Sequence, residues 1–310
     1  MSGDNPYLRT HHTPNMPIPL SSRAVTEYRR YGALLGFLLK AEVDAVFKQQ
    51  PFKTESDEDP LDLWRKLEER RGQLLPVQKG ELAPIPEALA ASVEAIKQRS
   101  AYKEYYEPVA DYVFGAVSIA SLLSPQCFVD LDYIDELAES ISASDTTEGQ
   151  LHFAFSDGQI AEPVVAGNTV LFSSARRDLY ADAIPSVVQT AEGEFSIVVR
   201  ARSRPNYIQV AHIDDQLFLI NGVHKVCALH RAGFTNCYCV FREASSLAEA
   251  GVSPQSTTML RDQVSKGPRP AAVLDFLNPD VAANLRLRSM QQVLQIVIQS
   301  ATFTVPTLAR

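Results

Sequence analysis

The chain has 310 residues, of which 45% are hydrophobic and 21% charged, and its formal net charge is −8 at pH 7. This composition excludes a wholly disordered, collagen-like or coiled-coil chain, and the length exceeds one domain of about 150 residues. No apolar run approaches the ~18 residues that a membrane helix needs, so we expect no membrane span. The first residues hold no apolar segment after a basic start, which predicts a cytoplasmic location.

Residues 1–20 contain four prolines and show no hydrophobic period, which predicts an extended arm. From Ser21 to Pro51, apolar residues recur at spacings of three and four, and this pattern predicts a helix. Shorter helices are predicted over Leu61–Arg71, after Pro86, and over Tyr102–Tyr112. Residues 21–114 are therefore predicted to be a helical N-terminal region, and this region with the arm is the expected surface for a protein partner.

Acidic residues are concentrated in the middle of the chain. Residues 115–243 hold 8 Lys and Arg against 16 Asp and Glu, whereas the flanks balance at 21 against 21. A surface that binds a phosphate backbone needs a basic excess, so this balance argues against nucleic acid as a partner.

After residue 115 the pattern is typical of a mixture of short strands with few helices. A helix is predicted over Asp132–Ser142, and Asp214-Asp215 predicts a tight hairpin. The predicted strands are Leu151–Phe155, Pro163–Val165, Thr169–Phe172, Phe195–Val199, Tyr207–Ile213 and Gln216–Ile220.

A strand, glycine turn, helix and strand follow one another from residue 216 to residue 241. Asn221-Gly222 ends the first strand, Val223–Ala232 is the predicted helix, and Gly233 suits its left-handed end. The last strand is predicted over Asn236–Phe241. Beyond it, residues 246–310 are predicted to be a helical extension, with a helix near Ala282–Met290 and an apolar run over Val293–Ile298.

The Gly222 turn is the strongest candidate for a binding site. A glycine between a strand and a helix lets the backbone approach a ligand, and the free amides of the first helical turn favour an anion. His224 and Lys225 lie in that turn, where they would contact phosphate oxygens. A strand, an Asn-Gly turn and a helix are also a common structural unit without a ligand, and this alternative stays open.

The box from Gly222 to Leu229, GVHKVCAL, resembles the signature of the ParB/sulfiredoxin-like superfamily. There, a Gly-x-His-Arg or Gly-x-Arg-Arg turn opens a helix beneath the phosphates of a nucleotide. Ile119–Ile141 looks like the opening strand and first helix of that fold, and Glu162–Val165 resembles its following strand. Over residues 117–241, the resemblance implies a mixed-sheet domain that binds ATP or CTP. Carboxylates near a phosphate site are the candidates to position Mg²⁺ or to act as a base, and the acidic residues in this region are Asp130, Asp132, Asp135, Glu136 and Glu139.

The box departs from each active subfamily. Val223 stands where sulfiredoxins carry their nucleophilic cysteine, which argues against sulfinic acid reduction, and Lys225 replaces the usual arginine. The helix-turn-helix domain and basic surface of the chromosome-partitioning members are not visible, which argues against a DNA clamp.

Further candidates surround this turn. Arg200, Arg202 and Arg204 follow a strand at spacing two and point the same way if the backbone is extended, so they would add to an anion site; solvated strand ends are the alternative. Glu136 is a candidate base, although a solvated helix face explains it as well. The cysteines, including the Cys-x-Cys pair at Cys237, suit buried packing better than a metal site, and no metal site is predicted.

The sequence thus predicts an α+β protein with a ParB/sulfiredoxin-like domain over residues 115–245. The first hypothesis is a nucleotide-binding domain that hydrolyses the nucleotide or transfers a phosphate. Its nucleotide-binding residues are Asn221, Gly222, His224, Lys225, Arg202 and Arg204, and its catalytic residues are Glu136 and His224. The alternative is an inactive, ParB-like interaction or scaffold protein in a larger assembly, and self-association into a homo-oligomer is left open.

Overall fold

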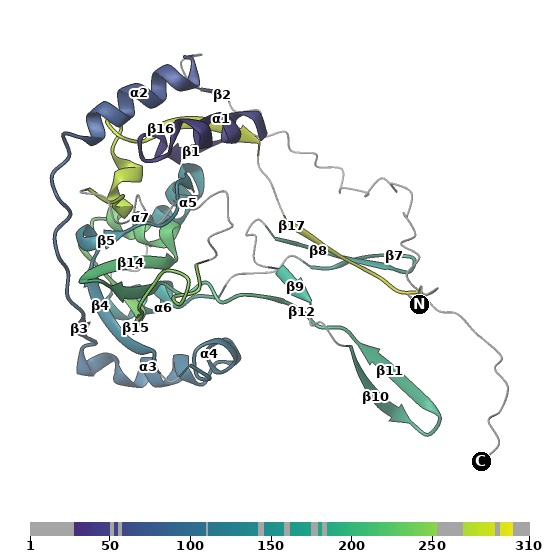
Figure 1. Cartoon of the computed structure of the whole chain (residues 1–310). Helices are drawn as coiled ribbons and strands as arrows, with labels where there is room; N and C mark the ends of the chain where they lie inside the picture. Colours follow the sequence, from purple (N-terminus) through teal and green to yellow (C-terminus); the bar gives the residue numbers. More distant parts are fainter. Residues whose placement is uncertain are drawn as a thin grey trace, which may run out of the picture.

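The computed structural model describes residues 28–49, 53–54, 58–109, 111–141, 146–157, 162–174, 179–181, 185–252, 269–288 and 292–299. Figure 1 shows helices gathered around two sheets, with smaller β-structures extending to one side. The predicted α+β class is therefore confirmed. Within the described ranges, no helix has both the length and the apolar character that crossing a membrane requires.

A mixed sheet of six strands forms the centre of the main body. The strand order is β3 (Ala83–Pro84), β4 (Val113–Ser118), β15 (Asn236–Glu243), β13 (Gln209–Ile213), β14 (Gln216–Asn221) and β5 (Leu122–Leu123). The outer strands are short, and the parallel neighbours are β13 with β15 and β14 with β5, whereas the other neighbours are antiparallel.

Helices cover this sheet and supply much of the core. Among the large side chains that are fully buried, Ile134 lies in a helix, Phe155 directly follows a helix, and Tyr207 lies in the segment before β13. The helices beside the sheet are η2 (Glu87–Leu89), α3 (Ala90–Lys97), α4 (Ser100–Tyr105), η3 (Ile119–Ser121), α5 (Leu131–Ile141), α6 (Thr147–Ala154), α7 (Val223–Arg231) and η4 (Val273–Leu277).

A second, antiparallel sheet pairs the first described strand of the chain with a strand from near its C-terminus. Its order is β2 (Lys53–Thr54), β16 (Ala283–Arg288), β1 (Tyr28–Ala33) and β6 (Phe128–Asp130). The elements η1 (Leu35–Phe37), α1 (Lys40–Gln49) and α2 (Pro60–Arg71) follow β1 along the chain.

The helix predicted from Ser21 to Pro51 is confirmed only over α1. Residues 28–33 form strand β1 instead, because this segment pairs with β16 on one side and with β6 on the other. Such long-range pairing overrides a helical pattern that is present in the sequence. The N-terminal region is thus not wholly helical, and the predicted arm lies outside the described residues.

Three further predictions are wrong. The helix expected near Ala282–Met290 is strand β16, whose side chains alternate between buried and exposed as those of a half-buried strand do. The apolar run after it is strand β17 (Gln292–Val297), so the C-terminal part is not a helical extension where it is described. The strand expected over Leu151–Phe155 is helix α6, because the Thr146 side chain accepts a hydrogen bond from the Gly149 amide and caps a helix there.

Other predictions are confirmed. Helices α2 and α5 match their predicted ranges closely. The β13–β14 hairpin turns at Asp214 and Asp215, whose φ angles of 48° and 62° suit a tight turn.

Three small β-structures make up the extension in Figure 1. Strand β17 pairs with β8 (Thr169–Ser174), which pairs with β7 (Val164–Ala166). Strand β9 (Leu179–Ala181) pairs with β12 (Ala201–Ser203), and β10 (Ser186–Ala191) pairs with β11 (Glu194–Val198). The strand expected from the resemblance at residues 162–165 therefore belongs to this extension and not to the six-stranded sheet.

Candidate functional site

The strand, glycine and helix predicted around Gly222 are present as β14, Gly222 and α7. Gly222 has φ 93°, a left-handed conformation that favours glycine. A Cβ atom at this position would lie 3.0 Å from the Cα atom of Ile208. The close approach that the glycine permits is therefore made by the protein's own backbone before β13.

Asn221, a predicted nucleotide ligand, is used inside the fold. Its Nδ2 atom donates hydrogen bonds to the carbonyl oxygens of Pro205 at 3.2 Å and Tyr207 at 3.1 Å. These bonds hold the segment before β13 against the end of β14, so the amide group fixes the backbone that passes beside Gly222.

Lys225 is buried, with 2% of its surface exposed. Its Nζ atom donates to the carbonyl oxygens of Ser156 at 2.9 Å, Asn206 at 2.5 Å and Ala154 at 3.4 Å, and it lies 5.7 Å from the centre of the Phe153 ring. Carbonyl groups at the end of a helix carry partial negative charge, which suits an ammonium group. In this conformation Lys225 links α7 to the end of α6 and does not point outward to a ligand.

His224 also makes an internal contact. Its Nε2 atom accepts a hydrogen bond of 3.0 Å from the amide of Asp130, and its ring packs edge-on against Tyr133 at 5.4 Å between centres. An Nε2 atom that accepts a hydrogen bond carries no proton, so the bond fixes the protonation of that nitrogen. The imidazole thereby joins the start of α7 to the start of α5.

Glu136 lies in a network of charges that joins β1 to α5. It pairs with Arg29 at 2.9 Å, and the same guanidinium lies 2.7 Å from Asp130. Arg30 pairs with Asp132 and with Asp135, both at 2.6 Å. Four of the carboxylates considered for a base or a magnesium site, Asp130, Asp132, Asp135 and Glu136, are thus each paired with an arginine.

Electrostatics in this network favour the charged state of Asp132. Burial acts to raise the pKa of Asp132, but hydrogen bonds from the backbone and side chain of Arg30, together with the charges of Arg30 and Arg29, outweigh it. The pKa of Asp132 therefore lies below its ordinary value of 3.8.

The predicted arginine cluster does not gather around Lys225. Arg202 is held by Glu104 on α4, whereas Arg200 and Arg204 are exposed. The structure thus brings Asn221, Gly222 and Lys225 together around the segment before β13, and it places His224 and Glu136 on the side of α5.

All four cysteines are buried and unpaired by disulfides, as the packing interpretation predicts. Burial raises the pKa of Cys227 and of Cys237 to about 12, so these thiols stay protonated at neutral pH. Among the described residues, no group of three or more His, Cys, Asp or Glu side chains is arranged to hold a metal ion.

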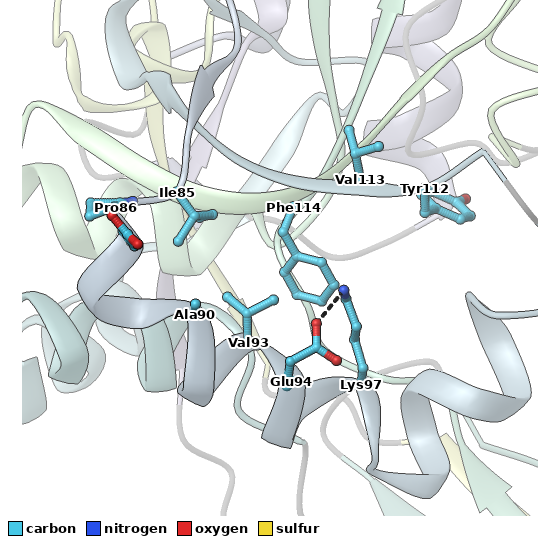
Figure 2. Close-up of a pocket in the computed structure, with 10 residues that line it drawn as sticks. Ile85, Pro86, Ala90, Val93, Glu94, Lys97, Tyr112, Val113 and Phe114 are labelled. Atoms are coloured by element: carbon cyan, nitrogen blue, oxygen red, sulfur yellow. Dashed lines mark hydrogen bonds and ion pairs between the residues drawn. The ribbon is translucent and has the colours of Figure 1, made fainter.

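A pocket of about 340 Å³ lies elsewhere, between α3 and β4 (Figure 2). Phe114 reaches from β4 toward Glu94 and Lys97 on α3, which pair with each other at 2.7 Å. A neighbouring pocket of about 330 Å³ shares Glu94, Lys97 and Tyr112 with it. No residue that the sequence singled out for binding or catalysis lines either pocket.

The least expected feature of the surface is the hairpin formed by β10 and β11. Every residue of both strands is exposed, and the fractions reach 66% for Val187, 65% for Phe195 and 71% for Ile197. Monomeric proteins seldom leave so many large apolar side chains exposed side by side, and such patches mark interaction sites. The sequence predicted a strand here but not its exposure, since alternation shows which residues share a face and not whether that face is covered.

Comparison with family models, with curated proteins and with solved structures finds no match for this chain. The functional argument therefore depends on the residues and their geometry.

Proposed function

We propose that this chain is an interaction protein: a ParB/sulfiredoxin-like domain that serves as a scaffold and binds a protein partner through its β-extension. The observation that carries the proposal is the apolar face of the β10–β11 hairpin, where Val187, Phe195 and Ile197 are each about two-thirds exposed. Burial of such side chains is the main source of binding free energy in protein interfaces.

The state of the Gly222 turn supports the same proposal. A phosphate site at a helix start needs amides and cations that face a ligand. Here Lys225 donates to backbone carbonyls, His224 accepts from the Asp130 amide, and Ile208 fills the space beside the glycine. These contacts stabilise the packing of α5, α6 and α7 against one another. A scaffold protein needs such rigid internal packing, but it does not need a phosphate site.

The position of the partner surface differs from the sequence-based expectation. Among the residues that the structure describes, the large apolar side chains exposed on β7, β10, β11 and at the end of β17 outnumber those on residues 28–114. We therefore assign partner binding to the β-extension, and the contribution of the N-terminal arm stays a prediction.

Affinity purification with quantitative mass spectrometry tests this function. Tagged full-length protein is recovered from its native cells beside a variant that carries Phe195→Ser and Ile197→Ser, and beside a control that carries Val188→Ser and Val198→Ser on the opposite face of the hairpin. We expect at least one protein to be recovered with the wild type and the control and lost with the first variant. Equal recovery with all three proteins would contradict the proposal.

Nucleotide binding at the Gly222 turn is the second candidate. The observation that favours it is the left-handed glycine at the junction of β14 and α7, the geometry that phosphate-binding turns require. Binding there would require Lys225 to leave its three carbonyl partners. ATP or CTP at millimolar concentration, with and without Mg²⁺, would then raise the melting temperature of the wild type by mass action but not that of a His224→Ala variant.

A further inference from the structure

Strand β17 forms one edge of the three-stranded sheet in the β-extension (Figure 1). It pairs with β8 on one side, and among the described residues no strand pairs with its other side. Val297 and Ile298, at its end, are exposed. A free strand edge is a row of N–H and C=O groups that readily pairs with another strand, so proteins either block it or use it.

The two edges of this sheet differ in the features that block pairing. Free edges are commonly protected by a charge, a proline, a bulge or a very short strand. At the opposite edge, β7 has only 3 residues and directly follows Glu162 and Pro163. Residues 292–299, QVLQIVIQ, contain no charge, proline or glycine, and the β8–β17 register has no bulge. The edge of β17 is therefore open to a further strand.

The register shows which backbone groups face the free edge. Ile298 donates its amide to the carbonyl oxygen of Asn168, at 2.8 Å, and this contact continues the pairing of β17 with β8. Backbone groups point to alternate sides along a strand, so the even-numbered residues of β17 face β8. Val293, Gln295 and Val297 therefore direct their amides and carbonyl oxygens to the free edge.

The side chains of β17 follow nearly the same order in both directions from Gln295. Leu294 and Ile296, which are isomers, lie on either side of it, and Val293 and Val297 come next. Two such strands that run antiparallel about a two-fold axis at Gln295 place Gln opposite Gln, Val opposite Val and Leu opposite Ile. Well-matched cross-strand pairs stabilise a sheet, and no like charges oppose each other here. The edge is complementary to itself, which favours a second copy over an unrelated strand.

We propose that a second copy of this chain pairs with the free edge of β17, so that two three-stranded sheets join into one. The two Gln295 residues then exchange backbone hydrogen bonds across the axis. Within each copy, Val165 lies opposite Val170, which lies opposite Ile296, so the joined sheet continues this apolar row from one copy into the other. The inference goes beyond the proposed function, which concerns the β10–β11 hairpin, and does not depend on it.

Sedimentation velocity of the full chain with charged variants tests the axis at Gln295. Two strand edges bury less than the roughly 800 Å² per partner of a standard interface, so wild-type protein should pass from monomer to dimer between about 1 and 200 μM. Gln295→Lys and Gln295→Glu should each weaken the dimer about fivefold or more, because each places like charges directly opposite one another. An equimolar mixture should associate more tightly than either variant alone, since opposite charges then face each other.

The same two changes at Gln78 are the matched controls. Gln78 is an exposed residue of the main body, between α2 and β3. Gln78→Lys and Gln78→Glu should dimerise as the wild type does, because they alter the net charge without touching the strand edge.

Residue-resolved hydrogen exchange gives an independent measurement. The amides of Leu294 and Ile296 should be protected at every protein concentration, because they bond to β8. The amides of Val293, Gln295 and Val297 should become protected only as the concentration rises through the range of dimerisation. This alternation along one strand is specific to pairing at its edge.

A wild-type protein that stays monomeric to about 200 μM, or a mixture of charged variants that associates no better than either alone, would overturn the proposal. Protection of Val293, Gln295 and Val297 that does not change with concentration would also overturn it, because another segment of the chain would then cover the edge. Phe195→Ser with Ile197→Ser should dimerise as the wild type does. A failure of the dimer is thus distinguishable from a failure of partner binding at the hairpin.

Discussion

The ammonium group of Lys225 is held by three backbone carbonyls, two of them at the end of α6. A lysine in the first turn of a helix after a glycine was reasonably predicted to contact phosphate, because spacing alone places it near the helix start. Its true direction depends on α6, a helix where the sequence pattern predicts a strand. The identity of the turn was thus predictable, and the direction of its side chains was not.

Replacement of Lys225 tests its structural role. Lys225→Met keeps the aliphatic stem but leaves buried carbonyl oxygens without their donor, so we expect a loss of about 1–3 kcal/mol in the free energy of unfolding. Urea denaturation measures this loss, and Lys79→Met, at an exposed lysine, serves as the control with a change under about 0.5 kcal/mol. A Lys225→Met protein as stable as the control would show that these bonds are not needed by the fold.

Gly222 and Gly233 allow a matched comparison, because their φ angles are 93° and 91°. A Cβ at Gly233 would meet no atom within 4 Å, whereas one at Gly222 would press on Ile208. Gly233→Ala should therefore cost about 1–2 kcal/mol from backbone strain alone, and Gly222→Ala at least about 1 kcal/mol more from crowding. Equal losses in urea denaturation would mean that Ile208 moves freely and that the turn is open.

At the scale of elements, β1 and α5 are joined by alternating charges. Asp132 has a folded-state pKa below 3.8, so it contributes stability that is fully present above pH 3.8. This contribution is lost as the pH falls below 3.8 and through the folded-state pKa. The sequence showed the acidic residues of α5, but β1 was predicted as helix, so their arginine partners could not be foreseen.

Asp132→Asn tests this contribution across pH. The variant should be less stable than the wild type at pH 7, and the difference should shrink as the pH falls below 3.8, because the unfolded state then takes up the proton of Asp132 before the folded state does. Urea midpoints from pH 7 to pH 2 measure the difference, with Glu68→Gln on α2 as the control. A difference that stays constant down to pH 2 would contradict the lowered pKa.

The hairpin formed by β10 and β11 should be removable without damage to the main body. All its residues are exposed, and loop length affects stability only weakly. We expect replacement of residues 186–198 by a short Gly-Ser linker to shift the melting temperature by about 2 °C or less, whereas Leu229→Ala in the core should cost about 2–5 kcal/mol. Loss of cooperative unfolding after the deletion would show that the hairpin supports the core.

For the whole molecule, sequence patterns predicted elements better than their assembly. The β13–β14 hairpin, α7 and β15 follow one another along the chain, and local turn chemistry at Gly222 and Gly233 was enough to predict them. Strand β16 shows period-two alternation over residues 283–287, which is the local signal of a half-buried strand. Its pairing with β1, more than 240 residues away, has no local signal at all. The exposed face of the hairpin likewise depends on what the rest of the chain leaves uncovered.

Photo-crosslinking in the native cells tests most directly the claim that the hairpin binds protein. A photoreactive phenylalanine analogue is placed at Phe195, and in a second protein at Lys79, an exposed site on the main body. The account predicts that light converts the first protein into discrete crosslinked species of higher mass and leaves the second largely unchanged. A protein that remains uncrosslinked at position 195 would contradict the account, because the apolar face of the hairpin would then have no partner.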